Sequence, residues 1–259
     1  MRVVNFTHGE LYAFGAYMMY ALVMLSGANF FVALVLAVAL GAALGALLEF
    51  VLLRRLRGAD IDTTMLVMIG AWIALQNGEQ LVWTGVAKSI DNPFPAAPLV
   101  IGAVSVAWNR VFVLFVALAL IAATYAIINH TRLGKAMRAT FQDRDTAALM
   151  GVQIGHIHTV TFALGSALAA AAGALLGPVF VAYPSMGDLA ASKAFAIVIL
   201  GGLGSIPGAT IGGFILALAE ELGAGYVSSG YRDAMGFLLI IAILVFKPTG
   251  LFARKERIG

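Results

Sequence analysis

The sequence predicts an all-α, polytopic transmembrane protein, and three observations support this prediction. Apolar residues make up 61% of the 259 residues, whereas Asp, Glu, Lys and Arg together make up 11%. An average soluble domain has about 25% charged residues, so the composition excludes a soluble globular protein and a disordered chain. Long stretches lack any charged residue, and the basic residues gather in alternate connections, a distribution that argues for a membrane protein and against a nucleic-acid binder.

Eight apolar segments follow one another along the chain, and each predicts a helix. They cover 11–25, 30–52, 63–82, 110–128, 160–181, 190–201, 209–224 and 233–246. A full span needs about 20 apolar residues. The first, sixth and eighth segments are short by this measure, and the sixth is expected to be a half-helix. We treat residues 1–259 as a single transmembrane domain.

The basic residues predict the orientation, because cytoplasmic connections are enriched in Lys and Arg. Twelve of the sixteen lie at the amino end, in two alternate connections or in the carboxyl tail: Arg2, Arg54, Arg55, Arg57, Arg132, Lys135, Arg138, Arg144, Lys247, Arg254, Lys255 and Arg257. The other side has only Lys88, Arg110, Lys193 and Arg232. This places loop 129–159 and both ends of the chain in the cytoplasm, and connection 83–109 outside.

Glycines at a spacing of four predict close packing between helices, since small residues let two helix backbones approach. They are Gly41 with Gly45, Gly173 with Gly177, and Gly204 with Gly208 and Gly212.

Loop 129–159 is the strongest functional signal. A simple helix–helix connection has about 2–8 residues, and this loop is far longer. It contains a predicted short helix, with Asp145 capping a start at Thr146 and Gly151 as a left-handed cap at the end. The helix would expose residues 147–150, which are small and apolar, for docking in a groove of a cytoplasmic partner. The alternative is a basic loop that contacts lipid headgroups.

This loop, with residues 131–139 and 148–152 at its centre, resembles the cytoplasmic loop of the permeases of branched-chain amino acid ABC transporters. Three other stretches resemble the same family in the same order, namely 4–10 with 15–17, 193–195 with 200–209, and 231–233 with 247–252. The resemblance covers nearly the whole chain and is greatest to the LivH-type subunit. Such permeases usually have another hydrophobic span before the Asn-Phe-x-His-Gly-Glu stretch, which here begins at Asn5, so we expect this chain to lack that first span.

The resemblance implies a permease of the bacterial inner membrane that pairs with a second, homologous permease. Two ATPase subunits would bind ATP and Mg²⁺, this chain would bind no cofactor, and a periplasmic binding protein would deliver the substrate. The predicted short helix would then be the coupling helix that contacts an ATPase. The residues expected there are Asp143, Arg144, Asp145, Thr146, Ala147, Ala148, Leu149, Gly151 and Val152, with Arg144 as the main ionic contact. The chain contains neither G-x-G-x-x-G nor G-x-x-x-x-G-K-[ST], so hydrolysis would occur on another chain.

The stretch from Gly201 to Gly208 contains four glycines and a proline and cannot form a regular helix interior. It predicts either a tight cytoplasmic turn or a broken helix beside the translocation path, since non-helical backbone at membrane depth needs protein or water around it.

Polar residues in or near the apolar segments are candidates for the pathway or its gate, because they are costly in lipid. The candidates are Asn5, His8, Glu10, Gln76, Asn77, Gly202, Gly204, Pro207 and Gly208. Glu79 clusters with Gln76 and Asn77. Glu220 and Glu221 are candidates for docking the binding protein, and Glu49 is expected in an ion pair or at the membrane interface.

No pattern predicts an enzyme. Cysteine is absent, which excludes a disulfide scaffold and thiol chemistry, and the spacing of His156 and His158 puts their rings on different helix faces. Two alternatives to a branched-chain amino acid importer stay open. One is a permease for urea or short amides, and the other is an ATP-independent channel or secondary transporter.

Overall fold

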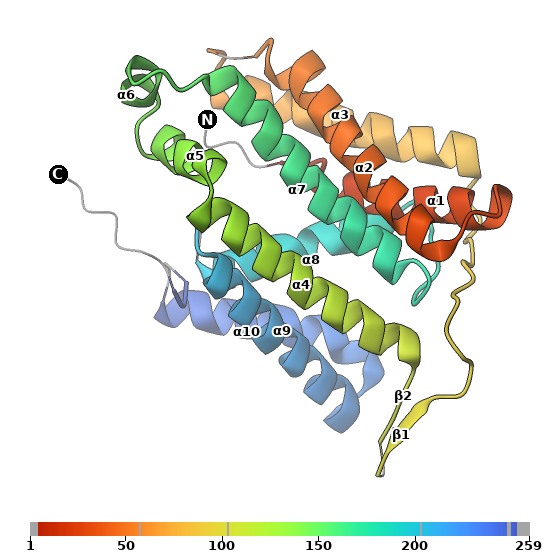
Figure 1. Ribbon diagram of the computed structural model, residues 1–259. Helices are drawn as coiled ribbons and strands as arrows, with labels where there is room; N and C mark the ends of the chain where they lie inside the picture. The colour runs from red at the N-terminus through yellow and green to blue at the C-terminus, as the bar shows by residue number, and fades with distance from the viewer. Residues whose placement is uncertain (1–4, 57, 103, 203, 248–249, 253–259) are drawn as a thin grey trace. The chain divides into compact units, whose positions relative to one another are not determined.

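A computed structural model describes residues 5–56, 58–102, 104–202, 204–247 and 250–252 (Figure 1). The chain forms two compact units, Met1–Ala190 and Ala191–Gly259. The described part is helical apart from loops and one two-stranded antiparallel sheet, β1 (Leu99–Ile101) and β2 (Val104–Val106), in which Val100 pairs with Ser105. The expected all-α class is confirmed, and the small sheet in connection 83–109 was not anticipated.

Each of the eight apolar segments forms a helix. In order these are α1 (His8–Tyr20), α2 (Phe30–Leu48), α3 (Ile61–Trp83), α4 (Trp108–His130), α7 (Ile154–Leu176), α8 (Met186–Gly201), α9 (Ile206–Tyr226) and α10 (Arg232–Phe246). Two of them end in a π-helical turn, Ala21–Leu25 after α1 and Glu49–Leu53 after α2. Four helices in the described part are long and apolar enough to cross a membrane: α2 with its π-turn, α4, α7 and α9. The number of such helices is therefore below the eight apolar segments.

The core of the first unit is the contact of α1 and α2 with α7 (Figure 1). The buried face of α2 is a stripe of small residues at a spacing of four, Ala33, Ala37, Gly41 and Gly45. A Cβ atom on Gly41 would lie 2.2 Å from the Cβ of Ala170, and one on Gly45 would lie 2.0 Å from Oγ of Ser166. The predicted close packing at this glycine pair is therefore confirmed.

Helix α7 packs against α1 in the same way. A Cβ atom on Gly173 would lie 1.8 Å from the carbonyl oxygen of Tyr12, and one on Gly15 would lie 2.2 Å from that of Ala170. Backbone touches backbone here, and only glycine allows this distance. The third predicted set is only partly confirmed, because Gly208 and Gly212 pack against the end of α8 whereas Gly204 has a φ of +83° and lies in a turn.

The second unit has a small apolar core of its own, formed by Ala196, Leu200, Leu216 and Ile240. Helices α9 and α10 pack together in it, joined through a short 3₁₀ turn, Ser229–Tyr231.

Candidate functional site

The predicted docking loop contains two helices, α5 (Arg132–Gln142) and α6 (Arg144–Leu149). The Thr131 hydroxyl caps α5 by accepting from the N–H of Gly134 at 3.1 Å. The Arg138 guanidinium donates to the carbonyl of Ile128, in the last turn of α4. The Arg138 bond fastens α5 to the end of α4, and α6 follows α5 along the chain and contacts it (Figure 1).

Asp143, and not Asp145, caps α6. Its Oδ1 accepts from the N–H groups of Asp145 at 3.0 Å and Thr146 at 3.1 Å, and its Oδ2 accepts from the Thr146 hydroxyl at 2.5 Å. The expected cap was wrong by two residues because Thr146 gives Asp143 a second bond, and Asp145 lies within the first turn, where a negative charge complements the helix dipole. The hydroxyl and N–H of Thr146 lower the pKa of Asp143 below its ordinary value.

The far end of α6 ends as predicted. Gly151 has a φ of +85° and donates to the carbonyl of Ala148, and Val152 donates to that of Ala147, each at 3.0 Å. The side chains of Leu149 and Met150 are 87% and 80% exposed, whereas Ala147 is buried. Ala147 was expected on the exposed face and is not, because α6 packs one face against α5 and α7.

Of the pathway candidates, the structure brings Glu10 and Gln76 into one polar region between α1, α3 and the start of α8. Glu10 is fully buried and its Oε1 accepts from the indole N–H of Trp72 at 2.9 Å. The amide of Gln76 donates to both carboxylate oxygens of Asp188, at 3.0 and 3.2 Å. Trp72 and Asp188 were missed, although Trp72 lies one helical turn before Gln76 on the same face.

Other candidates lie outside this region or serve local structure. Asn5 Oδ1 accepts from the N–H and hydroxyl of Thr7, at 3.1 and 2.6 Å, and so shapes the chain just before α1. The His8 side chain is partly buried in the first turn of α1. Asn77 is exposed and donates to the carbonyl of Ile73 in its own helix. A gating role for these three stays a prediction.

Glu79 and Glu49 are both buried, although each is an ionisable residue in a largely apolar stretch of helix. Glu49 accepts from the hydroxyl of Thr159 in α7, which helps to hold the end of α2 against that helix. Glu79 lies on α3 at the level of Tyr17, whose ring stacks on Trp83 at a centroid distance of 4.8 Å.

The glycine-rich stretch forms a turn between two separate helices. Gly202 and Gly204 have φ values of +96° and +83°, and the Ser205 hydroxyl caps α9 by accepting from the N–H of Gly208 at 3.1 Å. Pro207 lies in the first turn of α9, where its missing N–H is harmless. Residues after α10 hydrogen-bond to the end of α8 just before this turn. The backbone N–H groups of Leu251 and Phe252 donate to the carbonyls of Leu200 and Gly201, at 2.8 and 3.2 Å.

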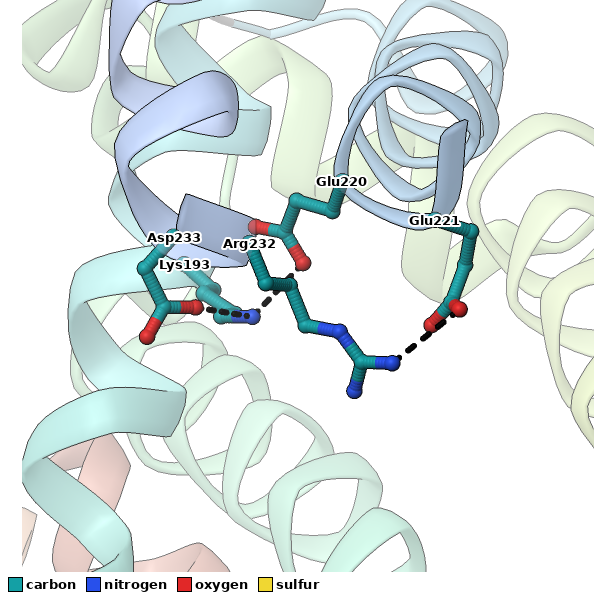
Figure 2. A network of polar contacts seen from close by, with 5 residues as sticks. All are labelled: Lys193, Glu220, Glu221, Arg232 and Asp233. Atoms are coloured by element: carbon teal, nitrogen blue, oxygen red, sulfur yellow. Dashed lines mark hydrogen bonds and ion pairs between the residues drawn. The ribbon is translucent and has the colours of Figure 1, made fainter. Parts of the chain in front are cut away.

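Three helices of the second unit are joined by ion pairs (Figure 2). Lys193 of α8 contacts Glu220 of α9 at 2.7 Å and Asp233 of α10 at 3.0 Å, and Arg232 contacts Glu221 at 3.1 Å. The Glu220 side chain is only 12% exposed and that of Glu221 is 66% exposed. Glu220 therefore has a structural partner, and Glu221 is the more accessible of the two candidates for docking. The lone cation Lys193 in an apolar segment could have indicated this network, since such a charge needs a counter-ion.

Comparison with known sequences supports the resemblance of the motifs to permeases of branched-chain amino acid transporters. The profile of a family described as "Branched-chain amino acid transport system / permease component" matches residues 1–244. The chain is 35% identical to the high-affinity branched-chain amino acid transport system permease protein BraD of Pseudomonas aeruginosa, and 36% identical to the permease protein LivH of Escherichia coli K12. Each alignment covers 98% of this chain and 87% of the relative.

A more distant relative has another stated cargo. The autoinducer 2 import system permease protein LsrC of Escherichia coli is 28% identical over 67% of this chain and 52% of its own length. No solved structure shows significant similarity to the chain.

Proposed function

Because this chain belongs to the family of permease components of branched-chain amino acid transport systems, we propose that it is the membrane-spanning permease subunit of an ATP-driven importer for these amino acids. It would work in the bacterial inner membrane with a second, homologous permease, two ATPase subunits that bind ATP and Mg²⁺, and a periplasmic binding protein. The motifs, the four apolar helices and the 35–36% identity over 98% of the chain support this proposal.

The geometry of α6 is the observation that supports the proposal most directly. A six-residue helix is capped at both ends, and its last residue, Leu149, and its C-cap residue, Met150, are large, apolar and largely exposed. Exposing such side chains on a charged loop is unfavourable unless a partner covers them. A cleft of an ATPase subunit would cover them, with Arg144 beside them as an ionic contact.

The same anchoring explains how a movement could pass to the membrane. Helix α5 is bonded to the end of α4, and α6 contacts both α5 and α7. When ATP closes the two ATPases, their clefts would displace α6, and the displacement would reach α4 and α7 through short, hydrogen-bonded connections. The permease pair would then alternate between inward and outward access.

Co-purification of the ATPase tests the coupling role. We expect Leu149→Glu to abolish retention of the ATPase on the tagged permease, because the carboxylate would be buried in an apolar cleft. The matched control is Val104→Glu, which makes the same kind of change at a side chain 61% exposed in β2, on the side predicted to face outward. Equal retention of the ATPase by both variants would show that α6 is not the docking element.

Uptake into proteoliposomes tests the cargo. With its cognate binding protein, the complete transporter is expected to accumulate leucine, isoleucine and valine in an ATP-dependent manner and to exclude urea. Uptake of urea without leucine would move the chain to a short-amide importer. Uptake without any ATPase would place it among channels or secondary transporters.

A further inference from the structure

Four buried polar atoms between α1 and α3 lack a hydrogen-bond partner among the residues that the structure describes. They are Oε2 of Glu10, both carboxylate oxygens of Glu79 and the hydroxyl of Tyr17. Glu10 and Tyr17 are completely buried, and Glu79 is 4% exposed. The three side chains lie close enough to interact electrostatically, Glu79 with Glu10 and Tyr17 with both.

The chemistry of these atoms indicates what they need. A carboxylate only accepts hydrogen bonds, and burying one without a partner is strongly unfavourable. Three of the four atoms are carboxylate oxygens, so a group with several N–H donors and a positive charge would satisfy them best. The face of the Trp83 ring that Tyr17 covers in this structure would offer a further surface that attracts a cation once the two rings separate.

Helix α3 makes few buried contacts with α1, so a cationic group could enter between the two helices if α3 moved. Only Thr64, Met68 and Glu79 of its 23 residues are buried, so its contact with the rest of the first unit is a narrow seam. The bond from Trp72 to Glu10 and the stack of Trp83 on Tyr17 join α3 to α1 along this seam. A small outward movement of α3 would break both contacts and uncover the two carboxylates together.

We propose that Glu79 and Glu10 bind the primary ammonium group of the transported amino acid when α3 moves away from α1. This inference rests on the proposed function, because it assigns a site within the permease to that cargo. The carboxylates accept the N–H donors, the Tyr17 hydroxyl lies at the edge of the site, and Trp83 covers the cation. In this structure, where α3 contacts α1, the indole N–H of Trp72 occupies the position at Oε1 of Glu10 that the ammonium group would take.

Coupled transport provides the first test. The complete transporter is reconstituted with Glu79→Gln or with Asp62→Asn, which makes the same carboxylate-to-amide change at an exposed position of α3. We expect Glu79→Gln to reduce leucine uptake per ATP hydrolysed by about tenfold to a hundredfold, the range for losing a hydrogen bond to a charged group. Stimulation of ATP hydrolysis by the binding protein should persist, and Asp62→Asn should transport normally.

The outcomes separate this inference from the proposed function. If the wild-type complex shows no ATP-driven uptake of leucine, the proposed function fails. If the wild type transports leucine and Glu79→Gln transports it with an unchanged ratio to ATP, only the ammonium site is refuted.

A labelling experiment on the wild-type transporter avoids any dependence on how the variants fold. Dicyclohexylcarbodiimide reacts with buried carboxyl groups while they are protonated, so a carboxylate that binds a cation is protected. Mass spectrometry reads the fraction of the Glu79 peptide that stays unmodified, as distinct from the labelled peptide and from any amide formed with an added amine. We expect 3-methylbutylamine, which has the leucine side chain and an amine, to protect Glu79, and 4-methylpentanoate, which has the side chain and no amine, to leave it labelled. Absence of labelling, equal protection by both compounds, or the same protection by K⁺ alone would overturn the proposal.

Discussion

The contact between α1 and α7 makes Gly173→Ala the sharpest test of the fold. The added Cβ atom would lie 1.8 Å from the carbonyl oxygen of Tyr12 and 3.1 Å from the backbone nitrogen of Ala16, whereas ordinary contact begins at 3.4 Å. The two backbones would have to separate by the difference between 3.4 and 1.8 Å, which is about 1.6 Å. No rotamer change can absorb this, because the atoms that clash belong to the main chain.

The cost follows from that displacement. Overpacking a core usually costs about 1–3 kcal/mol, and here the separation also weakens the packing of α1 along its length, since a gap of even 1 Å loses up to about half of the dispersion energy across it. We therefore expect Gly173→Ala to lower the free energy of unfolding by about 3 kcal/mol or more. Gly165 is the matched control, because it lies in the same helix and a Cβ atom there meets nothing within 4 Å.

Unfolding of the purified chain by SDS in mixed micelles, followed by tryptophan fluorescence, measures the difference. Trp83 reports on this region because its ring stacks on Tyr17 of α1. Gly165→Ala should be neutral or stabilising by up to about 1 kcal/mol, from helix propensity alone. If the two alanine variants unfold within about 0.5 kcal/mol of each other, which is the usual range for a harmless substitution, the backbone contact between α1 and α7 is not as close as described.

Three further predictions concern the loop and the second unit. Lys193→Gln should lower the free energy of unfolding by about 1–3 kcal/mol, because it leaves Glu220 partly buried without its cation, and Glu220→Gln on the same background should recover part of the loss in thermal unfolding. Asp143→Ala should remove the hydrogen-exchange protection of α6 amides, whereas Asp143→Asn should keep it. Because Thr146 lowers the pKa of Asp143, the negative charge of Asp143 stabilises α6 fully above the ordinary pKa of about 3.9, and this stabilisation is lost only as the pH falls through the lowered pKa. Hydrogen-exchange protection of α6 in the wild type should therefore not change between pH 7 and 5. Ser205→Ala should destabilise the start of α9 by about 1 kcal/mol, seen as faster exchange of its first amides, while Ser205→Asp should retain the cap.

The sequence predicted the helices and their glycine contacts well because both depend on local patterns. An apolar segment bounded by polar residues specifies a helix almost by itself, and the pair Gly41 and Gly45 marks a face that can approach another helix. The partner of that face was not predictable, since nothing near Gly41 in the sequence indicates Ala170. The same holds for α3, whose length and apolarity say little about how few of its residues are buried.

In the candidate sites, too, the features set by local sequence were predicted and those set by packing between helices were not. The limits of helix α6 were nearly right, and the cap was misplaced because Asp143 and Asp145 are chemically equal and only the bond to the Thr146 hydroxyl distinguishes them. Glu10 and Glu79 could be marked as unusual from their neighbours in the sequence, but their proximity depends on the packing of α3 against α1. Lys193 binds carboxylates that lie one and two helices further along the chain, at positions that no spacing rule connects.

The bonds from Leu251 and Phe252 to the carbonyls of Leu200 and Gly201 have a consequence for synthesis of the protein. A ribosome synthesises the end of α8 long before it synthesises Leu251 and Phe252. The carbonyl groups of Leu200 and Gly201 therefore lack these two hydrogen bonds until α9 and α10 have been inserted. These two bonds of the second unit therefore form only after residues 251 and 252 have been synthesised. A nonsense codon near position 250 would leave every helix of the described part encoded and yet remove both donors, and the truncated chain should become a substrate for membrane proteases.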